Sequence, residues 1–406
     1  MRLIFCLVMT VAMQESPAAV LHTGHGQRYA QLADAAAAAV PGDTIFIHNG
    51  VYPGDVDLNG LKGAPGRWVC ILAESPGKVT FRGGTSAWRA SSIAWLHIEG
   101  IVFSHQTGNG INFDDGARPD SPAHHLHFRQ CVFRDIVAQG NNDLLKLSGV
   151  RDFTIEGCVF ENGARGGSGV DMVGCRDGRI AQCRFADLGA NALQMKGGSS
   201  NIIVEACHFR NAGSRAINLG GSTGAAFFRP AGAGFEATRL SVRACVFEGS
   251  DVPVAFVGCT DSEVVQNTIY LPRRWAIRIL QENKDTVRFA KCARNVFRNN
   301  IIYVDDQLRT ACSTGAGTSP ETFVFSHNLW FHATDRQWQG PQLPAPEPGG
   351  MYGKDPQFAH PLSGDFSILP TSPAAGAGSA NSSPLSDHRG NAFRAAPSVG
   401  AFEVKP

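Results

Sequence analysis

The sequence predicts an all-β protein built as a solenoid, and a repeating triplet is the main evidence for it. The pattern Cys-x-Phe recurs through the middle of the chain, with 27, 25, 24 and 38 residues between successive cysteines, at Cys131, Cys158, Cys183, Cys207 and Cys245. Asn267, Asn300 and Asn328 continue the same frame without the sulfur. A repeat of about 22 to 28 residues, built from short β-prone pieces, is typical of one solenoid turn.

The composition agrees with a turn-rich all-β protein. Of the 406 residues, 43% are hydrophobic, 17% are charged and 46 are glycine. This length alone would predict two or three domains, but a solenoid grows by adding turns. The net charge of +1 argues against a nucleic acid or an anionic membrane surface as partner. An anionic polymer would therefore have to be bound by a local patch.

The N-terminus has the pattern of a secretory signal peptide. Arg2 precedes an apolar run from Leu3 to Met13, and small residues follow up to Ala19. We expect residues 1–19 to be the signal and the protein to be secreted or periplasmic. No later stretch is long and apolar enough to cross a bilayer.

The cysteines of the triplets are expected to be buried thiols and not disulfides. They occupy equivalent positions beside alternating apolar residues, as an internal stack of small hydrophobic side chains would. Cys292 and Cys312 lie outside this ladder, and the sequence leaves open whether they pair.

The N-terminal region carries the motifs of a known superfamily. An Ala-rich segment, Tyr29–Val40, predicts a short amphipathic helix that covers the end of the first turn. Pro41-Gly42-Asp43-Thr44-Ile45 then begins a strand, and Asn49–Tyr52 is expected to be a turn. With these motifs, and the strand Gly77–Thr80, the chain resembles the pectate-lyase-like right-handed parallel β-helix superfamily, including chondroitinase-B-like and alginate-lyase-like enzymes. The resemblance covers most of residues 28–335.

That resemblance implies a single-stranded right-handed parallel β-helix with a short N-terminal capping helix and an irregular C-terminal cap. We expect the β-helix over residues 20–337. A linker rich in proline and glycine then leads into a C-terminal capping segment, the two together spanning 338–406. We expect the protein to be a monomer.

One strand of each turn can be aligned by its apolar residues, and the alignment predicts two columns of surface side chains. Side chains alternate between the faces of a strand, so the middle residue of each apolar-x-apolar triplet points outward. The first column is Asn112, Lys146, Asp171, Gln194, Asn218, Ala255 and Arg278. The second, two residues later in each strand, is Asp114, Ser148, Val173, Lys196, Gly220, Val257 and Leu280.

This polar face suits recognition of a long polymer rich in hydroxyl groups. The resemblance implies a polysaccharide lyase that cleaves a uronic-acid polymer by β-elimination, with Lys or Arg as the base. We therefore expect Lys196 or Lys146 to be the base, with Arg215 and Arg278 as cations for the carboxylate and the transition state. A carboxylate raises the pKa of a neighbouring lysine, so Asp171 opposes this role. An ordinary exposed ion-pair ladder is the alternative interpretation.

Substrate contacts are expected from the columns and from two neighbouring segments. Asn112, Gln194 and Asn218 could bind hydroxyl or carboxylate groups. The turn between Leu219 and Leu240 is enlarged and carries Phe228 and Arg229, where an aromatic ring could stack on a sugar and a guanidinium could bind a carboxylate. Trp275 lies in a second basic and aromatic segment. Phenylalanines that only tether the loop are the alternative.

Three carboxylates are candidate metal ligands. Asp114 and Asp115 precede Gly116, and with Asp171 they could supply oxygen ligands for Ca²⁺. Two carboxylates before a glycine are also an ordinary turn. We treat the histidines at 124, 125 and 127 as solvated surface residues.

Two other functions stay open. A glycoside hydrolase on the same fold would use two carboxylates, for which Asp114 and Asp171 are the pair. A glycan-binding surface protein without catalysis is the third possibility.

Overall fold

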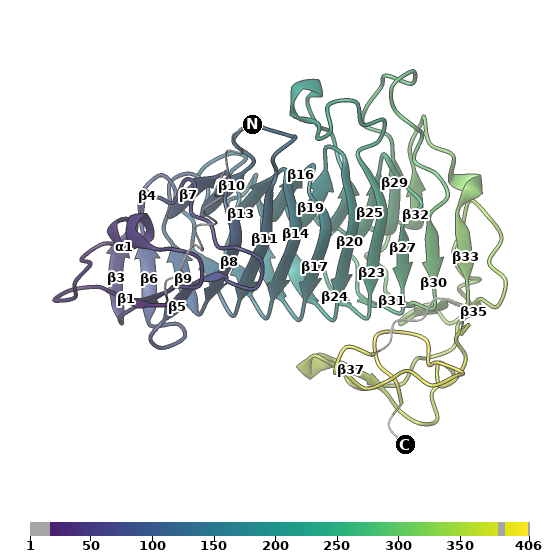
Figure 1. Ribbon diagram of the computed structural model, residues 1–406. Helices are drawn as coiled ribbons and strands as arrows, with labels where there is room; N and C mark the ends of the chain where they lie inside the picture. The colour runs from purple at the N-terminus through teal and green to yellow at the C-terminus, as the bar shows by residue number, and fades with distance from the viewer. Residues whose placement is uncertain (1–16, 381–385, 405–406) are drawn as a thin grey trace, which may run out of the picture.

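The computed structural model describes residues 17–380 and 386–404, and these form a rod of three parallel β-sheets (Figure 1). The segment 1–16, which holds most of the expected signal peptide, lies outside the described residues. Each turn of the chain adds one strand to each sheet, in the order sheet A, sheet B, sheet C. The predicted all-β, right-handed parallel β-helix is confirmed.

The strands of the three sheets stack in sequence order along the rod. Sheet A consists of β1 (Val20–Thr23), β2 (Thr44–Ile47), β5 (Val69–Ala73), β8 (Ala94–Glu99), β11 (Ala123–Arg129), β14 (Val150–Glu156), β17 (Arg176–Ala181), β20 (Ser199–Glu205), β23 (Ala237–Arg243), β26 (Cys259–Thr260), β27 (Glu263–Val265), β30 (Val296–Arg298) and β33 (Val324–Ser326). Sheet B consists of β3 (Gly50–Pro53), β6 (Val79–Arg82), β9 (Ile101–Ser104), β12 (Val132–Arg134), β15 (Val159–Glu161), β18 (Arg184–Leu188), β21 (His208–Ala212), β24 (Val246–Glu248), β28 (Thr268–Tyr270), β31 (Ile301–Val304), β34 (Leu329–His332) and β35 (Met351–Tyr352). Sheet C consists of β4 (Val56–Asp57), β7 (Trp88–Ser91), β10 (Ile111–Asp114), β13 (Leu145–Ser148), β16 (Ser168–Val173), β19 (Asn191–Lys196), β22 (Arg215–Gly220), β25 (Val252–Val257), β29 (Trp275–Leu280) and β32 (Thr310–Thr314).

The Cys-x-Phe triplets build the interior of the rod. The phenylalanine rings of successive triplets, from Phe133 to Phe247, stack with centroids 4.8 to 4.9 Å apart and planes within 7° of parallel. The cysteines are buried, and each thiol lies against a carbonyl of the preceding turn, as Cys158 does with Phe128 O at 3.6 Å. All cysteines among the described residues are free thiols, so Cys292 and Cys312 do not pair.

Three asparagines replace cysteine in the later turns and form a ladder of hydrogen bonds. Asn267 Nδ2 donates to Asn300 Oδ1 at 3.0 Å, and Asn300 Nδ2 donates to Asn328 Oδ1 at 2.9 Å. All three side chains are fully buried. Each amide oxygen also accepts a backbone N–H of the turn before, so the ladder satisfies polar groups at a bend of the chain.

The first turn is covered by the predicted helix. Helix α1 (Leu32–Ala38) is shorter than the expected segment and buries Leu32 and Ala35 against the core. The segment Asn49–Tyr52, expected to be a turn, is instead mostly strand β3, which pairs with β6.

The far end of the rod is covered by the segment that we expected to be a linker. Strand β35 pairs with β34, so sheet B continues beyond residue 337. Trp338, Leu343 and Ala345 pack on the main core. Glu347 accepts hydrogen bonds from Asn328 Nδ2 at 2.6 Å and Trp330 Nε1 at 3.1 Å, and thereby ends the asparagine ladder.

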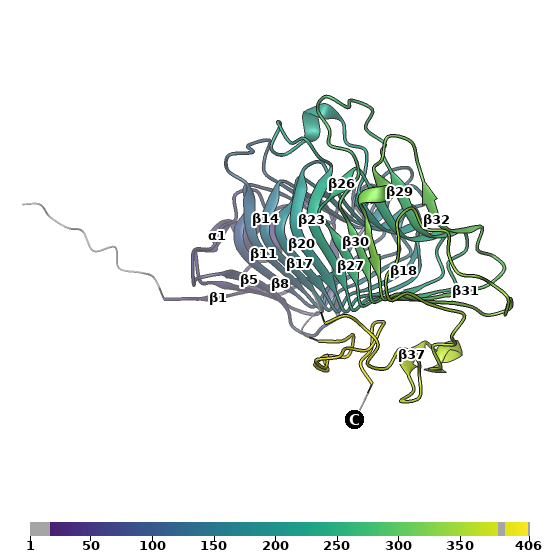
Figure 2. The same cartoon turned by 90° about the vertical axis from the view of Figure 1, so that its right-hand side faces the viewer.

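The C-terminal segment packs along the side of the rod and not across its end (Figure 2). It contains the short antiparallel pair β36 (Phe358–His360) and β37 (Asp365–Ile368). Phe366 and Phe402 bury Val246 of sheet B, and Ala401 N donates to Thr268 Oγ1 at 3.0 Å. The short 3₁₀ helices are η1 (Ala225–Phe227), η2 (Pro320–Thr322) and η3 (Pro361–Ser363). Within the described residues, no helix has the length and apolarity needed to cross a bilayer.

Candidate functional site

The two predicted columns lie on the outer face of sheet C. The strand register aligns Asn112 with Lys146, Lys146 with Asp171, Asp171 with Gln194, and Gln194 with Asn218. The same register continues through Ala255 to Arg278. In the second column, Asp114 aligns with Ser148, and Val173 aligns with Lys196. The predicted register is therefore confirmed.

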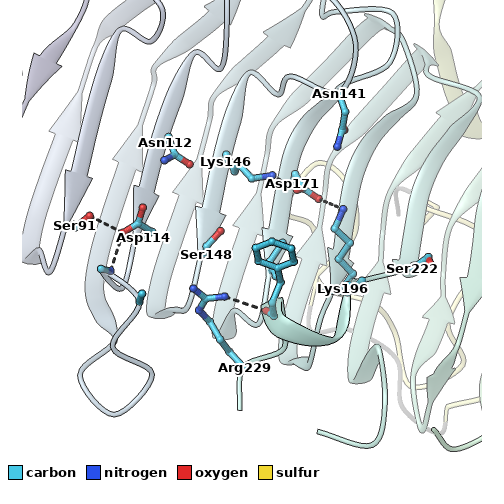
Figure 3. Close-up of a pocket in the computed structure, with 16 residues that line it drawn as sticks. Ser91, Asn112, Asp114, Asn141, Lys146, Ser148, Asp171, Lys196, Ser222 and Arg229 are labelled. Atoms are coloured by element: carbon cyan, nitrogen blue, oxygen red, sulfur yellow. Dashed lines mark hydrogen bonds and ion pairs between the residues drawn. The ribbon is translucent and has the colours of Figure 1, made fainter. Parts of the chain in front are cut away.

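Two lysines from different turns meet at one buried carboxylate (Figure 3). Lys146 Nζ lies 2.6 Å from Asp171 Oδ2, and Lys196 Nζ lies 3.0 Å from Asp171 Oδ1. Asp171 is 1% exposed although it points outward, and both lysine ammonium groups lie against its carboxylate. Lys196 Nζ also donates to Gln194 Oε1 at 3.2 Å.

A second buried carboxylate holds Lys146 from the other side. Asp143 Oδ2 lies 3.2 Å from Lys146 Nζ, and Asp143 Oδ1 accepts the backbone N–H of Ser168 at 2.8 Å. Burial and the nearby Asp171 raise the pKa of Asp143. Burial opposes the charge of Lys146, but Asp171 and Asp143 outweigh that effect and raise its pKa. Lys146 therefore remains an ammonium at neutral pH.

These groups form the floor of a cleft of about 650 Å³. Its walls come from sheet C, from the turn after β10 and from the enlarged loop after β22, which we call the strap (residues 221–236). The lining side chains and backbone belong to Ser91, Asn112, Asp114, Gly116, Ala117, Asn141, Lys146, Ser148, Asp171, Val173, Lys196, Ser222, Thr223, Gly224, Phe227 and Arg229. The cleft thus combines cations, hydroxyl groups and one aromatic ring, which suits a polar and anionic ligand.

Arg229 and Asp115 bind each other. Arg229 Nε lies 2.5 Å from Asp115 Oδ2, and Arg229 Nη2 lies 3.0 Å from Asp115 Oδ1. Asp115 is fully buried, and its hydrogen bonds raise the pKa of Arg229. We expected Arg229 to bind a substrate carboxylate and Asp115 to bind a metal ion. The bidentate pair uses the charge of both residues to fasten the strap to the turn after β10.

A row of glycines makes room for this arginine. Gly149 and Gly174 stand in equivalent turns, both with positive φ. A Cβ on Gly174 would lie 2.4 Å from Arg229 Cβ, and one on Gly149 would lie 2.8 Å from Arg229 Cδ. Any larger residue in this row would displace the strap.

The base of the strap is anchored by Glu236, which is 1% exposed. Glu236 Oε2 accepts the N–H of Gly197 at 2.8 Å, and Glu236 Oε1 accepts the N–H of Thr223 at 2.7 Å. Asn283 also donates to Glu236, which joins the strap to the segment after β29.

The aromatic residue that faces the cleft is Phe227 and not Phe228. Phe228 is 2% exposed and packs against Phe289, with ring centroids 5.1 Å apart and the Arg288 guanidinium 4.7 Å from its ring. It cannot stack on a sugar. Phe227 is 63% exposed and lines the cleft.

The three carboxylates expected to bind calcium are not brought together. Asp115 is paired with Arg229, and Asp171 lies between two ammonium groups. Asp114 Oδ1 accepts hydrogen bonds from Ser91 Oγ at 2.6 Å and from Gly116 N at 2.7 Å. Throughout residues 17–380 and 386–404 there is no group of three His, Cys, Asp or Glu residues suited to a metal ion. These residues therefore do not fit a calcium site.

The remaining predicted residues lie beyond the cleft. Arg215 Nη2 pairs with Glu282 at 2.9 Å, and Arg215 Nη1 donates to Asn218 Oδ1 at 3.3 Å. Arg278 lies three turns beyond Lys196 and has its guanidinium 4.4 Å from the ring of Trp275. Burial and the charges of Arg215 and Arg274 lower the pKa of Arg278. These residues do not line the cleft.

Sequence reasoning missed Arg89, considered Asp143 only as a further metal ligand, and considered Phe227 only as one of several aromatic residues of the enlarged turn. Asp143 lies three residues before Lys146, just before the strand, where an alignment of strand triplets does not extend. The sequence does not distinguish Phe227 from its neighbour Phe228. Arg89 aligns with Asn112 in the register and could have been found by extending the first column one turn earlier.

Comparisons with known proteins support the fold. Residues 83–269 match the family described as "Right handed beta helix region". The pectate lyase Pel9A superimposes with a TM-score of 0.62 at 14% identity, over 97% of this chain and 98% of its own. XylC, solved in complex with xylose, has a TM-score of 0.55 at 10% identity, and the match covers 84% of this chain and 87% of XylC. The PL6 family polysaccharide lyase Pedsa3628 from Pseudopedobacter saltans has a TM-score of 0.50 at 12% identity, and the match covers 83% of this chain and 94% of Pedsa3628. No curated protein matches the sequence. At these identities the similarity shows a shared fold.

Proposed function

We propose that the protein is a secreted polysaccharide lyase that cleaves a uronic-acid-containing polysaccharide by β-elimination in the cleft. The observation that carries the proposal is the convergence of Lys146 and Lys196 on Asp171 at the floor of the cleft. The similar folds of a pectate lyase and a PL6 polysaccharide lyase support it.

The chemistry needs a cation for the uronate carboxylate and a base for the neighbouring C–H proton. We assign the cation to Lys146, because two carboxylates hold it in the ammonium form. We assign the base to Lys196, which contacts a single carboxylate. In its neutral form Lys196 Nζ takes the proton from the carbon next to the carboxylate. The C–H electron pair becomes the new C=C bond, and the glycosidic oxygen leaves with its bonding pair and takes a proton from water.

A hydrolase fits the geometry less well. Asp114 and Asp171 lie on strands two turns apart, about 10 Å by strand stacking. Both oxygens of Asp171 are paired with lysine ammonium groups, so neither is free to transfer a proton to a glycosidic oxygen.

The test is to incubate the protein with alginate, pectate, glucuronan and glycosaminoglycans while following the ultraviolet absorbance of unsaturated uronides. Growth of this absorbance is expected for at least one polymer. Reducing ends without absorbance would indicate a hydrolase, and binding without cleavage would indicate a glycan-binding protein.

Variants then assign the roles. Lys196→Ala is expected to lower kcat at least about 100-fold, the low end for loss of a general base. Lys146→Ala is expected to raise KM as well as lower kcat. The control is Lys78→Ala, because Lys78 is exposed and lies outside the cleft. Full activity of Lys196→Ala would reject the assigned base.

A further inference from the structure

The outer face of sheet C is exposed at its N-terminal side, covered over two turns directly beyond the cleft, and partly exposed again at Arg278. At the N-terminal side the outward side chains of Asp57 and Arg89 are exposed. Beyond Gln194, in the same column, Asn218 is 1% exposed and Ala255 is fully buried. An outward residue of a sheet is buried only where other parts of the chain cover it. The face that holds the cleft is therefore open on the N-terminal side of the lysines and covered over the next two turns on their other side.

The covering begins directly at the lysine. A Cβ on Gly221 would lie 2.8 Å from Gln194 Nε2 and 3.2 Å from Lys196 Cβ, so the backbone of the strap lies against both side chains. Arg215 closes the next position, because its guanidinium binds both Asn218 and Glu282. We call Gly221, Arg215 and Glu282 the end wall.

The end wall is held by its own contacts. Glu236 binds the N–H groups of Gly197 and Thr223 and also accepts from Asn283. Arg288 Nη2 donates to Ala231 O at 2.8 Å, which ties the strap to the segment after β29. The wall is therefore a built part of the structure, with buried polar groups satisfied on both sides.

The opposite side of the cleft is open and carries a free cation. Arg89 stands one turn before Asn112 in the column, and among the described residues its side chain has no ion-pair partner. Arg89 and Asp171 lie on strands three turns apart, about 14 Å by strand stacking. An anionic chain lying along the strand stack would meet Arg89 first and the lysines last.

We propose that the cleft binds the end of an acidic polysaccharide chain, so that the protein acts from chain ends and not within chains. This inference rests on the proposed function. The last sugar lies against the end wall beside Lys196, and the rest of the polymer leaves over Asn112 and Arg89. A polymer passing through the site would need the space that Gly221, Arg215 and Asn218 occupy.

The first experiment compares bond cleavage with chain length on the polymer that the protein cleaves. Absorbance of unsaturated products is expected to rise while viscosity barely falls, and the early products are expected to be of one small size. A rapid fall in viscosity with products of mixed length would overturn chain-end action and leave the lyase function intact.

A binding experiment separates the two proposals if no cleavage is seen. The wild-type protein is titrated with equal masses of polyuronate of two mean lengths. If the amount of protein bound is proportional to the number of chain ends, the inference is supported. If the amount bound depends only on the mass of polymer, the inference is overturned. Absence of binding to every polyuronate overturns the proposed function together with the inference.

Two variants test the wall and the entrance. Arg215→Ser with Glu282→Ser is expected to open the end wall and shift the products toward mixed lengths, whereas Arg210→Ser with Asp187→Ser removes a surface ion pair on sheet B and should not. Arg89→Ser is expected to raise the Kd of long oligomers about five- to tenfold and that of dimers little. Equal weakening for dimers and long oligomers would contradict the proposed path.

Discussion

Arg229 and Asp115 are 114 residues apart in the chain and form a two-point ion pair in which the carboxylate is fully buried. This contact fastens the strap across the turns after β10, β13 and β16, and it fixes the side of the cleft that carries Phe227. The two charges neutralise each other and stabilise the wall of the cleft, so neither is available to a ligand.

Asp115→Ala should therefore leave the Arg229 guanidinium without its partner in a mostly buried position. We expect a loss of about 2 to 3 kcal/mol in unfolding free energy, and a lower activity because the cleft wall loosens. Urea unfolding measures the first effect, and Asp120→Ala, at an exposed position in the same loop, is the control. Equal stability of the two variants would show that the pair does not hold the strap.

The glycine row predicts a difference between two matched substitutions. Gly174 and Gly157 have φ values of 62° and 60°, so alanine is strained equally at both. A Cβ at 174 would clash with Arg229, whereas at 157 the nearest atom would lie 3.6 Å away. Gly174→Ala should be less stable than Gly157→Ala by about 1 to 2 kcal/mol or more, and it alone should reduce activity. Similar urea midpoints and similar activities of the two variants would show that close packing of the strap on the glycine row is not required.

Asp143 should make the stability of the protein fall with rising pH. Burial, reinforced by Asp171, raises the pKa of Asp143 in the folded state above its unfolded value. The folded state then binds the proton more tightly, so the stabilisation is complete below about pH 4 and is lost as the pH rises through the folded pKa. Asp143→Asn is neutral throughout and should gain stability relative to the wild type as the pH rises above about 4, the usual range of an unfolded Asp. Urea unfolding at several pH values measures this, and a difference that stays constant with pH would contradict the raised pKa.

The asparagine ladder predicts how position 300 tolerates change. Asn300→Ala would leave the N–H of Asn267 and the carbonyl of Val264 without their buried partner, at a cost of about 2 to 3 kcal/mol in unfolding free energy. Asn300→Cys should cost less, because earlier turns place a cysteine in the same frame with its thiol against a carbonyl of the preceding turn. Thermal or urea unfolding ranks the variants, and an alanine variant as stable as the cysteine variant would show that these hydrogen bonds do not matter.

The repeat in the sequence was sufficient to predict the rod and the register of its outer columns. Strand side chains alternate between faces and parallel strands stack at a constant spacing, so equivalent positions of successive turns become neighbours. The meeting of Lys146, Asp171 and Lys196 follows from that rule. Asp143 joins them from just outside the strand, where the alternation of side chains no longer applies.

Loops do not obey the repeat, and only the tertiary structure decided what they do. The strap has no equivalent in neighbouring turns, so its path could not be read from the pattern. The strap folds back over sheet C and brings Arg229 into contact with Asp115. It also buries Phe228, leaves Phe227 exposed, and covers the outward residues directly beyond the lysines. The local sequence determines which residues a strand presents outward. Which of them a ligand can reach depends on contacts between segments far apart in the chain, and those contacts are made only when the whole rod has formed.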